Sequence, residues 1–350
     1  MTDQQKEASY INLSSIVSSF AVVFIHSNGC FWTFSDTARY WWTANIIESV
    51  FYFAVPVFFM ISGATLLDFF ERYGLKEYFH KRVQKTVLPY VIWSFFGLAF
   101  QIYYLKNIDK EDINGRYIIN GLLSGRLVDI YWFFMALFCL YLSIPLLAAV
   151  EKGLRKKVFV YLAISSFLFN CLIPFFNKSF HVDVGYQFSV DVGRGGILYL
   201  ILGYLLHKCE IKRKVRGVLY ATGILGLLIH LIGTYWLSVT AGEIVSTYKG
   251  YNNVPCIMYS VAVFLFLKHV WEDRLQQVRP VSSAIRFLKD YTFSLYIVHW
   301  YFLNIMVKEF EIDTRSIYYR LGAPFIVVAV TICFTWVMRK IPLGKKLLPR

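Results

Sequence analysis

Apolar runs of membrane-spanning length recur along almost the whole chain, and no other feature of the sequence restricts the fold as strongly. There are about ten of them, each close to the 20 residues that an α-helix needs to cross a bilayer. We place them at residues 10–27, 43–67, 86–105, 130–150, 158–175, 194–207, 217–238, 252–267, 287–307 and 317–338. Because these runs and their loops use nearly all of the 350 residues, we expect residues 1–350 to form a single transmembrane domain.

Composition also predicts an all-α, polytopic bundle of membrane helices. Hydrophobic residues make up 57% of the chain and charged residues only 17%, which leaves too little polar surface to cover a soluble globule. The formal net charge of +14 does not indicate nucleic-acid binding, because the basic residues form short clusters between the apolar runs. The expected surroundings of the chain are therefore the lipid bilayer.

The basic clusters fall on alternate sides of the predicted spans. They lie within residues 72–85, 152–157, 208–216, 268–289 and 339–350. By the positive-inside rule this side is cytoplasmic, and both termini lie on it, which requires an even number of spans. We expect a multi-pass protein of the cell membrane, most simply a bacterial cytoplasmic membrane.

Two classes of protein are disfavoured by what the sequence lacks. The six cysteines are dispersed without paired spacing, so neither a metal site nor a disulfide framework is predicted. There is no phosphate-binding glycine loop and no nucleotide-binding fingerprint, which argues against an ATP-driven pump.

His26 is the leading candidate for function, because ionisable side chains are costly in hydrocarbon and mark functional sites. It lies near the outer end of the first run. Ser15 and Ser19 fall within about 20° of it around an α-helix, which predicts a small polar face that leads about 16 Å toward the histidine. The alternative is a histidine that meets lipid headgroups above two helix-packing serines.

Glu48 lies in the second run, at a depth similar to that of His26. Either the two side chains pair, and the carboxylate orients the imidazole as a general base, or Glu48 faces the outer water. Further along the same run, Pro56, Ser62 and Gly63 predict a kink or a close helix contact.

Four more residues carry ionisable side chains that are candidates for function: Arg82, Lys85, His299 and His230. Arg82 and Lys85 precede the third run and share a helical face, where they bind either anionic lipid or a phosphate-bearing ligand. In the ninth run, His299 follows Tyr296 by one turn, either in a substrate pocket or as a structural pair. His230 in the seventh run is a weaker candidate for the same two roles.

The motifs and their order resemble the membrane-bound acyltransferase-3 family over most of the chain. Five stretches in sequence, on a ten-span pattern, make this resemblance specific. They are Val22–His26, Val55–Gly63, Arg82–Trp93, Trp132–Phe134 with Tyr141 and Pro145, and Ser294–His299.

The resemblance implies transfer of an acetyl or other short acyl group from cytosolic acyl-coenzyme A, normally acetyl-CoA. The implied acceptor is a hydroxyl of an extracytoplasmic glycan or lipid-linked sugar, and no metal is implied. His26 matches the catalytic histidine of the family and would take the proton of the attacking hydroxyl. The other site residues expected are Glu48 for catalysis, Arg82, Lys85, Ser15 and Ser19 for the donor, and His299, Tyr296 and Trp132 for the substrate.

One position departs from the family pattern. The family commonly has an arginine eleven residues before its catalytic histidine, where this chain has Ser15. Either another base such as Arg82 supplies that charge, or the donor is bound differently, or this chain has drifted from acyl transfer. The last case keeps two alternatives open: an exporter of exopolysaccharide or lipid-linked sugar, and a scaffold in a glycan-synthesis complex.

Overall fold

The computed structural model describes residues 3–185 and 188–349, and these residues form helices and loops without a strand. The α-helices are α1 (Asp3–Ser27), α2 (Arg39–Phe51), α3 (Ala54–Leu66), α4 (Leu75–Arg82), α5 (Leu88–Phe100), α6 (Gly115–Ser124), α7 (Trp132–Ala148), α8 (Lys152–Ser166), α9 (Ile173–Phe180), α10 (Gly196–Lys208), α11 (Arg213–Leu228), α12 (Thr234–Ala241), α13 (Val254–Asp273), α14 (Arg279–Leu288), α15 (Thr292–Glu309), α16 (Ile317–Met338) and α17 (Pro342–Leu347). Short 3₁₀ turns are η1 (Gly29–Trp32), η2 (Phe69–Glu71), η5 (Lys110–Asp112), η6 (Asp129–Tyr131), η8 (Asp191–Gly193), η10 (Leu275–Gln277) and η11 (Lys289–Tyr291).

The predicted polytopic helical bundle is confirmed. Within the described residues, eight helical stretches are long and apolar enough to cross a membrane: Tyr10–Ser27, Arg39–Glu71, Leu75–Leu105, Asp129–Ala148, Lys152–Phe180, Arg213–Ala241, Val254–Asp273 and Ile317–Met338. The two other predicted runs correspond to α10, a shorter apolar helix, and to α15, which has 18 residues. The total of ten spans stays a prediction.

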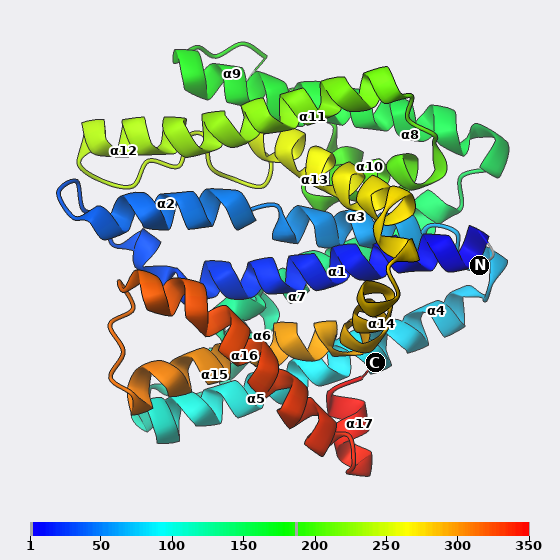
Figure 1. The fold of residues 1–350 in the computed structure, drawn as a ribbon. Helices are drawn as coiled ribbons and strands as arrows, with labels where there is room; N and C mark the ends of the chain where they lie inside the picture. Colours follow the sequence, from blue (N-terminus) through cyan, green and yellow to red (C-terminus); the bar gives the residue numbers. More distant parts are fainter. Residues whose placement is uncertain (1–2, 186–187, 350) are drawn as a thin grey trace.

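The long helices lie side by side, and the chain begins and ends toward the same end of the bundle (Figure 1). That end, on the right of the view, also holds α4 and α14, whereas the α1–α2 and α15–α16 connections lie at the opposite end. The arrangement fits an even number of crossings. Below, the end that carries α4 and α14 is called the basic end.

Large apolar side chains cover much of the outside of the bundle. Leu146 of α7, Trp236 of α12 and Phe325 of α16 are each more than half exposed. Soluble proteins seldom expose so much contiguous apolar surface, and a bilayer covers it at no cost. The chain is therefore a multi-pass membrane protein.

The predicted kink in the run 43–67 is confirmed. Helix α2 ends at Phe51, α3 begins at Ala54, and the two residues between them form a turn. Pro56 lies in the first turn of α3, where its missing N–H removes no intrahelical hydrogen bond. The break therefore costs little and lets α3 leave the axis of α2.

The predicted close contact at Gly63 is also confirmed, and its partner is α10. A Cβ atom at Gly63 would lie 1.8 Å from the carbonyl oxygen of Leu200, and one at Gly203 would lie 2.1 Å from the carbonyl oxygen of Met60. Glycines on both helices thus let the two backbones touch, which is how membrane helices gain packing energy without a hydrophobic driving force.

Several of the long helices contain a π-helical turn. Such turns are rare and are frequent at functional sites. The first begins directly after Arg82, and the last contains His230. In the described residues they are η3 (Val83–Val87), η4 (Gln101–Leu105), η7 (Phe167–Leu172) and η9 (Ile229–Gly233).

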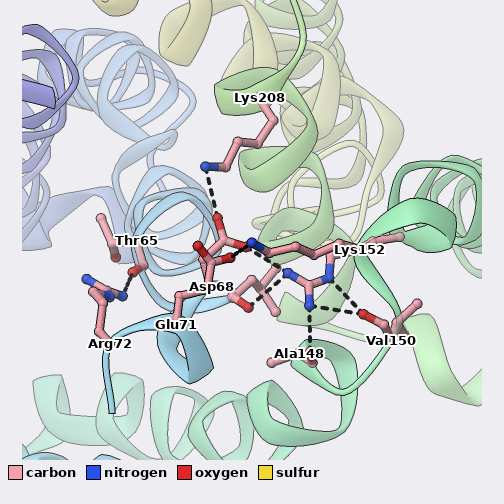
Figure 2. A network of polar contacts seen from close by, with 10 residues as sticks. Thr65, Asp68, Glu71, Arg72, Ala148, Val150, Lys152 and Lys208 are labelled. Carbon is pink, nitrogen blue, oxygen red and sulfur yellow. Dashed lines mark hydrogen bonds and ion pairs between the residues drawn. The ribbon is translucent and has the colours of Figure 1, made fainter. Parts of the chain in front are cut away.

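A network of polar contacts around Asp68 joins the helices at the basic end (Figure 2). Arg155, at the start of α8, is 5% exposed. Its guanidinium donates to Asp68 Oδ1 at 2.7 Å and to the carbonyl oxygens of Ala148 at 2.6 Å and Val150 at 3.0 Å. Lys208, at the end of α10, pairs with the other Asp68 oxygen at 2.9 Å. One charge network thus holds the ends of α3, α7, α8 and α10.

We expect Arg155→Ala to lower the free energy of unfolding by about 2–4 kcal/mol, because it removes the donor to Asp68 and leaves the buried carbonyls of Ala148 and Val150 without one. Thermal or denaturant unfolding of the purified protein in detergent measures this loss. The matched control is Lys152→Ala, which breaks the exposed Lys152–Glu71 pair and should cost about 1 kcal/mol or less. Equal losses in the two variants would contradict the role given to Arg155.

Candidate functional site

The polar face predicted on α1 is turned toward α15. Ser15 lines a cavity together with Tyr296, Ser19 lines a small pocket with Leu295, and His26 contacts His299. The helical spacing of the two serines and the histidine therefore places all three against one neighbouring helix, as a shared face requires.

His26 and His299 form a hydrogen-bonded pair inside the bundle. His26 Nδ1 lies 2.6 Å from His299 Nε2, and the two rings are parallel within 3°. His299 Nδ1 in turn lies 2.8 Å from the carbonyl oxygen of Leu295. His299 is fully buried, whereas His26 is only partly buried. Of the two imidazoles, His26 is thus the one that a substrate can reach.

The partners of these rings fix their tautomers. A carbonyl oxygen only accepts, so we assign the proton of neutral His299 to Nδ1, which leaves Nε2 as an acceptor. His26 must then donate from Nδ1 to His299 Nε2. In this tautomer His26 Nε2 keeps a free lone pair and can accept a proton from a substrate.

The pairing of His26 with Glu48 that the sequence suggested is wrong. Glu48 Oε1 instead accepts from Lys249 Nζ at 2.9 Å, and both side chains are almost fully buried. The two residues do lie at a similar depth in the bundle, as expected. Asn28 bonds to Ala44 and Phe24 stacks on Phe51, so the antiparallel helices α1 and α2 bring residues 26 and 48 to the same level. Glu48 faces another side of its helix.

Lys249 comes from the loop between α12 and α13 and reaches into the bundle. Its ammonium lies 4.1 Å from the ring centroid of Tyr52 and 4.5 Å from that of Phe31, both within cation–π range. Burial lowers the pKa of Lys249, and the Glu48 carboxylate opposes this by favouring the charged form. No pattern in the sequence indicated Lys249, because its neighbours are typical of an ordinary polar loop.

A cavity of about 180 Å³ opens beside Tyr296, on the basic-end side of the histidine pair, and neither histidine is among the residues that line it. Ser15, Thr86, Tyr141 and Tyr296 are among the residues that line it. The ring of Tyr296 contacts that of His299, with 6.0 Å between the centroids. The predicted residue Ser15 therefore opens on the same space as Tyr296, one helical turn from His299. Ser19 does not line this cavity, and its hydroxyl donates to the Ser15 carbonyl.

Arg82 does not line this cavity, but it lies against Tyr141, which does. Its guanidinium carbon lies 5.4 Å from the ring centroid of Tyr141 and 5.7 Å from that of Tyr78. Its Nε is buried without a hydrogen-bond partner, and within the described residues it has no carboxylate partner. Lys85, within the π turn η3, is exposed. A half-buried, unpaired guanidinium suits an anionic ligand.

The two aromatic residues predicted for the substrate lie in different places. Tyr296 is buried, and its hydroxyl donates to the Ile130 carbonyl at 2.7 Å. Trp132, at the start of α7, is 38% exposed and stacks on Tyr251 with 5.7 Å between centroids. Tyr296 thus belongs with the histidine pair, and Trp132 with the residues around Lys249.

Arg320 of α16 is a site residue that the sequence analysis overlooked. It is 1% exposed and donates to Thr43 Oγ1 at 2.8 Å and to Asn28 Oδ1 at 3.3 Å. It thereby fixes the chain just after His26 to the start of α2. The signal was present, since Arg320 is a charge inside a predicted membrane run.

Comparison with known proteins identifies a family for nearly the whole chain. A family model described as an acyltransferase domain matches residues 9–340. This range contains both histidines, Arg82 and the residues that line the cavity. No curated protein and no solved structure matches the chain.

Proposed function

Because the chain belongs to the acyltransferase-3 family, and is thus a membrane acyltransferase in kind, we propose which group it moves and between which molecules. The donor is acetyl-CoA or another short acyl-coenzyme A from the cytosol. The acceptor is a hydroxyl of a cell-envelope glycan or a lipid-linked sugar, on the outer side of a bacterial cytoplasmic membrane. The observation that carries the proposal is the His26–His299 pair, which contacts Tyr296 at one side of the cavity, while Arg82 contacts Tyr141, another residue that lines the same cavity.

The cavity suits a coenzyme A donor that enters from the basic end. Its phosphates meet the unpaired guanidinium of Arg82, with the exposed Lys85 nearby in sequence. The narrow arm that carries the thioester extends past Tyr141 and Ser15 toward Tyr296. In this arrangement the thioester carbonyl arrives beside the histidine pair, and Arg82 supplies a charge in place of the family arginine missing at Ser15.

The chemistry follows from the tautomers. The acceptor oxygen attacks the thioester carbonyl carbon while His26 Nε2 takes the hydroxyl proton, because a neutral hydroxyl is a poor nucleophile. The carbon–sulfur bond then breaks, and the departing thiolate of coenzyme A takes that proton from His26. The products are an acyl ester and free coenzyme A. His299 positions the reacting imidazole through its Nε2.

We expect His26→Ala to abolish release of free coenzyme A from acetyl-CoA in the presence of an envelope-glycan acceptor, since the imidazole that would take the hydroxyl proton is then missing. A thiol-reactive dye measures the release. His181→Asn is the control, because His181 is exposed and asparagine tolerates its left-handed backbone. Undiminished turnover by His26→Ala would refute the assigned base. Glycan export that persists without coenzyme A release would favour the exporter alternative.

We expect His299→Ala to lower kcat by about 10²-fold or more, because His26 loses the acceptor that fixes its tautomer. The KM for acetyl-CoA should change little. His299→Gln should recover part of kcat, since an amide can both donate to a carbonyl and accept from His26. The control is His269→Ala, which removes the same kind of bond to the carbonyl four residues earlier. Equal kcat in the Ala and Gln variants would contradict the positioning role.

We expect Arg82→Ala to raise the KM for acetyl-CoA and the dissociation constant of coenzyme A by about ten- to a hundredfold, the effect of losing a hydrogen bond to a charged group. Steady-state kinetics and calorimetry measure the two quantities. Arg72→Ala serves as the control, because Arg72 is an exposed arginine at the same end that donates to the Thr65 carbonyl. Unchanged coenzyme A binding in Arg82→Ala would remove this donor site.

A further inference from the structure

A second group of buried polar side chains lies at the depth of His26, on another side of α2. We call it the Glu48 cluster, and it consists of Asn45, Glu48, His230 and Lys249. Asn45 and Glu48 come from α2, His230 from the π turn η9, and Lys249 from the loop between α12 and α13. The acyl-transfer steps derived above use none of these four residues.

Three atoms of the Glu48 cluster are buried without a hydrogen-bond partner in the described chain. They are Asn45 Oδ1, Glu48 Oε2 and His230 Nε2, and each of these residues is no more than 2% exposed. Native proteins leave few such atoms unsatisfied. Three of them in one place, contributed by two separate helices, indicate that the cluster is completed by a molecule from outside.

The unsatisfied atoms define the chemistry of that molecule. A carboxylate oxygen and an amide oxygen accept only, so the ligand must bring donors. Lys249 Nζ, by contrast, has three donors and gives one to Glu48 Oε1. Groups that donate to the acceptors and accept from the ammonium are hydroxyls. Several of them on one molecule are needed to meet the separate atoms.

A row of aromatic rings continues from this cluster to the surface. Tyr52, which contacts Lys249, stacks on Tyr251 with 4.6 Å between centroids, and Tyr251 stacks on Trp132. Trp132 is 38% exposed. Aromatic faces pack well against the apolar C–H face of a ring whose edge carries polar groups. The exposed Trp132 ring at the end of this row, together with a carboxylate, an amide and an ammonium, matches the mixed apolar and polar surface of a sugar.

We propose that the Glu48 cluster and the row of Trp132, Tyr251 and Tyr52 bind the sugar of the acceptor. This proposal rests on the proposed acyltransferase function and assigns its acceptor subsite to a polyhydroxylated ring. The ligand reaches the cluster when the loop that carries Lys249 moves outward. Gly242 and Gly250, both with positive φ, bracket this part of the loop and give it backbone freedom.

The test measures sugar binding and acyl transfer separately. Purified protein in proteoliposomes is titrated calorimetrically, without donor, with the methyl glycosides of glucose, galactose, N-acetylglucosamine and rhamnose, and with glycerol. The same compounds then serve as acceptors with acetyl-CoA. We expect saturable binding of at least one glycoside and none of glycerol. In Glu48→Gln the dissociation constant and the acceptor KM should rise about ten- to a hundredfold, while the KM for acetyl-CoA stays the same.

Two further variants separate a ligand-binding role from a structural one. Glu71→Gln removes an exposed carboxylate that pairs with Lys152 at the basic end, and it should leave glycoside binding unchanged. The double variant Glu48→Gln with Lys249→Met leaves no unpaired charge in the bundle, so it keeps the fold even if Glu48→Gln alone does not. Its sugar binding should still be weakened at least tenfold.

Three results would overturn the proposal. The first is wild-type protein that binds no glycoside, and the second is Glu48→Gln protein with unchanged glycoside affinity. The third is wild-type glycoside affinity in the double variant, because this would mean that the ion pair only holds the loop. A water molecule as the natural occupant of the cluster would give the first result. Wild-type protein that binds a glycoside but releases no coenzyme A would support the subsite and refute the proposed transfer, so the two failures are distinguishable.

Discussion

Polar side chains inside hydrocarbon have no water to bond with, and this constraint decides where the ionisable groups of the bundle lie. Each buried charge is held by an element distant in the sequence: Glu48 by Lys249, Arg320 by Thr43, and Arg155 by Asp68. These bonds set which helices are neighbours and at what level they meet. Where buried atoms keep no partner, as in the Glu48 cluster and at Arg82 Nε, the same constraint points to ligands.

The missing family arginine at Ser15 is easier to understand once the cavity is known. Ser15 lines the space next to Thr86 and Tyr141, and Arg82 lies against the Tyr141 ring. A long cation at position 15 would project into this space, whereas serine leaves it open. In the proposed donor site, Arg82 lies against two tyrosine rings and offers its charge to the same ligand from the α4 end of its helical stretch. Under this proposal the departure changes where a cation meets the donor and leaves room for the donor's narrow arm.

Much of the fold could be predicted from the sequence, because lipid imposes a length and an apolar surface on every spanning helix. The face shared by Ser15, Ser19 and His26, the break before Pro56 and the contact at Gly63 are local properties of one helix, and periodicity or residue type reveals them. The partner of Glu48 could not be found in this way, because spacing along α2 does not tell which element packs against each side. Lys249 could not be predicted for a second reason. Its loop has a sequence typical of a solvent-exposed segment, but the loop folds into the bundle.

The charge and the tautomer of the His26 ring depend on whether its partner is the Glu48 carboxylate, as the sequence suggested, or the neutral ring of His299. A carboxylate at His26 would stabilise its imidazolium form and so favour a charged pair inside the bundle. Neutral His299 instead accepts one hydrogen bond from His26 Nδ1 and is itself held by the Leu295 carbonyl. It therefore selects the tautomer with Nε2 free without introducing a charge. The separation of Glu48 from His26 fits the two proposals: the carboxylate is available to hold a hydroxylated ligand at the same depth, and the proposed base stays neutral until an acceptor hydroxyl arrives.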